Sequence, residues 1–162
     1  MLFRSTPGYW LQTGDFWDGF FNPTYWPSLV LRTGVCGMLA GLYALLVATR
    51  ADAGDVKCRL VRNACEWGLV GLIITAAAQF WYWQAIPATV TEKAVQLMPL
   101  PVAAFRSSLW LAAVIAAVLI LSWLAARRLP VFVAVGLMVA GLAWFGAFES
   151  FRESVRKPYI IT

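Results

Sequence analysis

Four long apolar runs constrain this chain more than any other feature. They cover residues 29–48, 64–86, 109–126 and 131–148, and each has roughly the 20 residues with which an α-helix crosses a hydrocarbon core of about 30 Å. With 61% hydrophobic residues and a mean hydropathy of +0.71, the 162-residue chain is also too apolar for a soluble domain of its size. The runs predict an all-α integral membrane protein in which four transmembrane helices form one bundle and one domain.

The segment before the first run predicts a short interfacial element. Residues 1–27 are aromatic and Gly-rich and lack the continuous apolar core of a signal peptide. Pro23 and Pro27 should keep the chain out of a regular helix here, and Ser28 should then cap the first span.

The connections between the spans indicate an orientation. Residues 50–62 should form a polar connection on the same side as the tight turn at Arg127 and Arg128. Basic residues are equally numerous on the two sides, so the assignment depends on the tight arginine turn. By the positive-inside tendency, the side that carries this turn is cytoplasmic. Residues 87–101, with Pro99 and Pro101, should be an extracytoplasmic loop. We therefore predict a multi-pass protein of a bacterial inner membrane with both termini extracytoplasmic.

The absence of histidine excludes most redox and metal chemistry within this chain. Imidazole is the usual haem ligand, the commonest copper or zinc ligand and the commonest general base, and the chain has none. Cys36, Cys58 and Cys65 contain no Cys-x-x-Cys pair and should be free thiols. The net charge is +5, and the lysine and arginine residues lie at the ends of apolar runs, which argues against nucleic-acid binding. We expect no catalytic residues, no metal site and no cofactor ligated by this chain.

The first span carries three residues with candidate roles. Gly37 and Gly41 form Gly-x-x-x-Gly, a spacing that lets another helix approach closely. Arg32 lies one turn inside the span, where its guanidinium could bind a haem propionate, a quinone or a lipid phosphate. The alternatives are an arginine that extends to the headgroups and an ion pair within the bundle.

Charged residues also lie beyond the fourth span and at the start of the second. Glu149, Arg152, Glu153 and Arg156 share one helical face. They form either a solvated helix end or a docking surface for an extracytoplasmic partner. Glu66 follows Arg62 by four residues, and this spacing predicts a surface ion pair.

Three short motifs resemble subunit I of the cytochrome bd quinol oxidases. Asn22-Pro23 followed by Arg32-Thr33, Gly37 and Gly41 is similar to the family's helix reading Asn-Pro and then His-Thr-x-x-x-Gly-x-x-x-Gly. The sequence from Glu153 to Tyr159 resembles the family's Glu-x-Gly-Arg-Gln-Pro-Trp, and Phe105-Arg106 matches its Phe-Arg before the next ligand-bearing helix. The resemblance covers most of the chain and corresponds to the second half of that subunit.

The chain differs from the family at two positions and in one segment that bind the family's cofactors. Arg32 stands where the family has its low-spin haem histidine, with one gap in the alignment, and Ser108 stands where it has the methionine ligand. Residues 87–104 are also too short for the family's quinol-binding segment. The resemblance therefore implies a non-haem-ligating subunit that anchors partners, namely a haem-bearing bd-like subunit and c-type cytochromes.

Two other functions stay open at this point. The chain could itself bind quinol or quinone, or it could be a small transporter component. Because the sequence ends directly after a family motif, the natural protein could also continue into an extracytoplasmic domain, for which a c-type cytochrome fits best.

Overall fold

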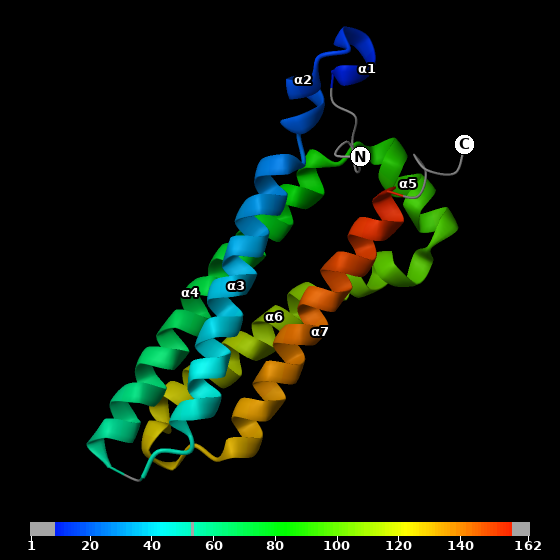
Figure 1. The fold of residues 1–162 in the computed structure, drawn as a ribbon. Helices are drawn as coiled ribbons and strands as arrows, with labels where there is room; N and C mark the ends of the chain where they lie inside the picture. The colour runs from blue at the N-terminus through cyan, green and yellow to red at the C-terminus, as the bar shows by residue number, and fades with distance from the viewer. Residues whose placement is uncertain (1–8, 53, 157–162) are drawn as a thin grey trace.

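The computed structural model describes residues 9–52 and 54–156, and these residues are helices and short connections (Figure 1). The elements in chain order are α1 (Trp10–Thr13), α2 (Phe16–Phe20), α3 (Tyr25–Ala48), α4 (Asp55–Ala85), α5 (Ala88–Leu97), α6 (Pro99–Leu124), the 3-10 turn η1 (Ala126–Arg128) and α7 (Val131–Arg156).

Four of these helices, α3, α4, α6 and α7, are long and apolar enough to cross a membrane. The prediction of an all-α, multi-pass membrane protein with a short N-terminal helical segment is therefore confirmed. The helices form two hairpins, with α3 beside α4 and α6 beside α7, and the hairpins pack against each other (Figure 1). The helix α5, the pair α1 and α2, and the last described turn of α7 lie at one end, called here the α5 end. The α3–α4 turn and η1 lie at the other, the η1 end (Figure 1).

The buried interior changes character along the bundle. Toward the η1 end it is mostly aliphatic and includes Met38, Leu42 and Leu119. Toward the α5 end it becomes aromatic, and the rings of Phe105 and Phe151 stack with centroids 4.1 Å apart. The bulky rings fill the space between α4, α6 and α7 near the predicted extracytoplasmic surface.

The first span begins earlier than predicted, and Ser28 does not cap it. α3 starts at Tyr25 after Thr24, whose backbone N–H donates to Oδ1 of Asn22 at 3.0 Å. The Thr24 hydroxyl donates to the same oxygen at 2.7 Å. Asn22 thus organises the turn into the helix, and Pro27 lies within the first turn, where a missing backbone N–H costs little.

Three other boundaries correct the prediction. Residues 55–62, predicted as part of a polar connection, are the first two turns of α4. The predicted loop 87–101 contains the helix α5, and Pro99 and Pro101 lie in the first turn of α6. The fourth span continues as helix to Arg156. In each case the missed part is polar or short, so no apolar run marks it.

The predicted ion pair between Arg62 and Glu66 is absent among the described residues. Both side chains instead contact Trp123 of α6. Its indole N–H donates to Oε1 of Glu66 at 3.1 Å, and the Arg62 guanidinium lies 4.5 Å from its ring centroid. The spacing suggested a local pair, whereas a neighbouring helix supplies a better partner for both groups.

Candidate functional site

A seam of glycines joins α3 to α4. A Cβ added to Gly41 would lie 2.8 Å from Cα of Gly68, and one added to Gly71 would lie 2.7 Å from Cα of Met38. Gly37 is placed at the same seam with more room, since its added Cβ would lie 3.8 Å from Cα of Gly71. The two helices therefore touch through backbone, as small residues allow in membrane helices.

A buried polar cluster ties α4 to α6 and α7. The side chain of Gln79, 2% exposed, donates to the Phe105 carbonyl at 3.0 Å and to Oγ of Ser108 at 2.7 Å. Its Oε1 accepts from the indole N–H of Trp144 at 2.8 Å. The Ser108 hydroxyl donates in turn to the Phe105 carbonyl at 2.6 Å. Each polar atom that Gln79 brings into the apolar interior is thus bonded, which is the condition for burying an amide cheaply.

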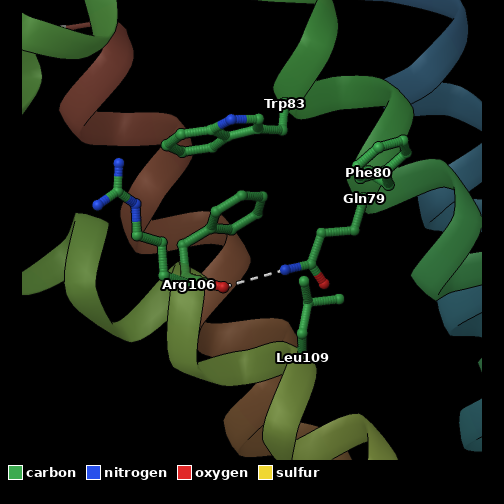
Figure 2. A pocket seen from close by; sticks show the side chains of 6 residues that line it. Gln79, Phe80, Trp83, Arg106 and Leu109 are labelled. Carbon is green, nitrogen blue, oxygen red and sulfur yellow. Dashed lines mark hydrogen bonds between the residues drawn. The ribbon is translucent and has the colours of Figure 1, made fainter.

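A pocket of about 300 Å³ opens beside this cluster, between α4 and α6 (Figure 2). Trp83 and Phe105 stack on one side with centroids 5.7 Å apart, and Phe80 and Leu109 complete the apolar lining. The Arg106 guanidinium lies 5.2 Å from the Trp83 ring centroid. The pocket therefore combines aromatic surfaces with a cationic donor, an arrangement that suits a planar group carrying hydrogen-bond acceptors.

Arg32 forms an ion pair within the bundle. Its Nη2 lies 3.1 Å from Oε1 of Glu149 on α7, and Nη2 of Arg152 lies 2.6 Å from Oε2 of the same carboxylate. One carboxylate thus serves two guanidinium groups. The Arg32 side chain remains 46% exposed, so it can still contact a group outside the chain.

Arg152 has a second polar atom on this charged face, and Glu153 and Arg156 follow it along α7. Nε of Arg152 is buried and finds no acceptor within the described part of the chain. Glu153 is half-buried and engaged in an interaction of its own. The side chain of Arg156 lies outside the described residues. The structure therefore brings Arg32, Glu149 and Arg152 into one cluster, with two cations and one anion.

Positions 32 and 108, which the resemblance aligned with haem ligands, are both engaged in contacts within the chain. Arg32 is directed to Glu149, and Ser108 is buried in the Gln79 cluster. Tyr82 and Phe148, with ring centroids 5.3 Å apart, are buried at the same end of the bundle. Each of the two side chains is therefore bonded to another residue of this chain.

Sequence reasoning missed Gln79 and Trp144 entirely. The available signal was an amide in the interior of an apolar run, which must find partners in hydrocarbon. It also missed the α4 half of the seam, although Gly68 and Gly71 stand close together in the second span.

The described residues contain no group of three His, Cys, Asp or Glu side chains that could hold a metal ion. Cys36, Cys58 and Cys65 are free thiols. Comparisons of the chain with protein-family models, curated proteins and solved structures give no match. The sequence and the structure identify it as a multi-pass helical membrane protein.

Proposed function

We propose that this membrane protein is a non-haem-ligating subunit of a respiratory electron-transfer complex related to the cytochrome bd quinol oxidases. In this role it anchors and packs against haem-bearing partner subunits. The observation that carries the proposal is the state of positions 32 and 108. Both lack a haem-ligating side chain, and both are engaged in contacts within the chain, Arg32 with Glu149 and Ser108 with Gln79.

The cluster of Arg32, Glu149 and Arg152 is the proposed contact with an anionic group of a partner. It carries one more positive than negative charge, and Arg152 retains a buried N–H donor without an acceptor among the described residues. A haem propionate, a lipid phosphate or an acceptor oxygen of a quinone would complete it through charge-assisted hydrogen bonds. Glu153, which follows Arg152 on α7, belongs to the same proposed docking face.

A quinol- or quinone-binding subunit is the second candidate function. It is favoured by the pocket in Figure 2, where Arg106 could donate to a quinone carbonyl and Trp83 offers an aromatic surface. A stoichiometric quinone in the lipid extract of the purified chain would favour this candidate over an anchoring role.

Affinity isolation of the tagged chain from its native membranes in a mild detergent tests the anchoring role. We expect haem-bearing subunits to co-isolate with the wild-type chain. Arg32→Leu should lower their amount per chain about tenfold or more, because a charge-assisted hydrogen bond contributes roughly 1.5 to 3 kcal/mol. Arg32→Lys should recover part of the loss, since an ammonium lacks the planar fork of the guanidinium.

Lys93→Leu is the matched control, because Lys93 is an exposed cation on α5 at the same end of the bundle. The thermal midpoint of each purified variant separates loss of docking from loss of folding. Isolation of the wild-type chain without any haem protein would refute the anchoring role. Unchanged co-isolation of Arg32→Leu would refute the part assigned to Arg32.

A further inference from the structure

A groove of about 840 Å³ runs along the outer side of the α3–α4 hairpin toward the η1 end. Small residues form much of its lining, and most of them are on α3. These residues are Gly37, Ala40, Gly41, Ala44 and Ala48 of α3, Ala51 just beyond it, and Ala64 of α4. Exposed side chains of Tyr43 and Trp67 also line it. The groove follows from the same glycine seam that holds the two helices together.

The groove is longer than one leaflet of the hydrocarbon core and shorter than the whole core. Its lining begins at Gly37, near the middle of α3, and ends at Ala51, just beyond the helix. At 1.5 Å per residue this is about 20 Å, about two thirds of a hydrocarbon core of about 30 Å.

A cation lies at the membrane-surface end of the groove. Arg50 lines it, is exposed, and makes no ion pair with any described residue. Asn63 adds an exposed amide to the lining. Two other arginines at the η1 end are already engaged, since Arg127 pairs with Asp55 at 2.9 Å and Arg62 lies over Trp123.

The surrounding charge favours an anion at this end. Six basic residues lie there, Arg50, Lys57, Arg59, Arg62, Arg127 and Arg128, against three acidic ones, Asp52, Asp55 and Glu66. An excess of three positive charges at a membrane surface attracts anionic headgroups. We infer that the α3–α4 groove binds an anionic phospholipid, with one acyl chain along the small residues and the phosphate at Arg50. This inference does not depend on the proposed respiratory role.

Native mass spectrometry of the purified full chain with added dioleoyl phosphatidylglycerol or dioleoyl phosphatidylcholine tests the inference. The wild type should retain phosphatidylglycerol at about fivefold lower lipid concentration than phosphatidylcholine, the preference expected from one basic residue at the surface. Arg50→Gln should abolish the preference. Arg128→Gln should preserve it, because Arg128 is an exposed arginine at the same end and does not line the groove.

Ala44→Phe fills the groove and should lower retention of both lipids severalfold. A photoreactive benzoylphenylalanine at Val47, an exposed lining position, provides a second measurement that does not require the filled variant to fold. In native membranes it should cross-link to phospholipid. Equal retention of the two lipids by the wild type, or an equal loss in Arg50→Gln and Arg128→Gln, would overturn the inference. Cross-linking at Val47 to a protein helix instead of lipid would overturn it as well.

Discussion

Gly41→Leu should destabilise the folded chain by about 3 kcal/mol or more, at or above the upper end of ordinary overpacking. A Cβ at this position would lie 2.8 Å from Cα of Gly68 and 3.0 Å from the Ala64 carbonyl oxygen, so backbone, and not a flexible side chain, stands in its way. α3 and α4 would have to separate along the seam. The measurement is the free energy of unfolding in mixed micelles, titrated with denaturing detergent.

Substitutions at two other glycines serve as comparisons for Gly41→Leu. Gly136→Leu on α7 should cost little through packing, because nothing lies within 4 Å of its added Cβ. Gly37→Ala should cost little as well, since its added Cβ would make an ordinary van der Waals contact 3.8 Å from Cα of Gly71. Equal stability of Gly41→Leu and Gly136→Leu would show that the seam is not a tight helix contact.

Gln79→Leu should cost about 1 to 3 kcal/mol for each buried group that it leaves without a partner. The substitution removes the acceptor of the Trp144 indole N–H and the donor to Ser108 Oγ, and both partner residues are buried. Gln84→Leu is the matched control, because Gln84 is an exposed residue of α4 near the end of the helix. Unfolding in mixed micelles again gives the measurement.

The double variant Gln79→Leu with Trp144→Phe separates a buried unpaired donor from a simple loss of packing. Replacing both partners by apolar groups removes the unpaired indole N–H and should recover part of the stability lost in Gln79→Leu. If the double variant is as unstable as the sum of the two single variants, the hydrogen bond between Gln79 and Trp144 contributes nothing specific.

The four spans were predictable because hydropathy acts over about 20 residues and one property decides the outcome. The ends of the helices were not predictable from hydropathy. The first turns of α4 and the last turn of α7 are polar helix that continues beyond the apolar run, and hydropathy alone cannot distinguish this from a loop. The start of α3 depended on the Asn22 side chain, whereas the sequence pattern pointed to Ser28.

The sequence indicated Arg32 as a candidate site residue, but it did not indicate which residue Arg32 contacts. Arg32 was evident as a charge inside an apolar run, yet the sequence could not tell which of several carboxylates would reach it. The answer, Glu149, lies 117 residues away on α7. The Gln79 cluster shows the same limit, because a buried amide must be bonded but its partners on α6 and α7 come from packing. The contact between Gly41 and Gly68 likewise could not be predicted, because it depends on how α3 and α4 pack against each other.

The haem content of the chain itself tests the central claim most directly. The tagged chain is produced in a host that supplies excess haem, purified free of other subunits, and measured by its reduced-minus-oxidised visible spectrum and by pyridine haemochrome. The account predicts no Soret band and far less than one haem per chain, because Arg32 and Ser108 supply no ligand and their neighbourhoods are occupied by Glu149, Gln79 and Trp144. A stoichiometric haem that remains with the isolated chain would contradict it.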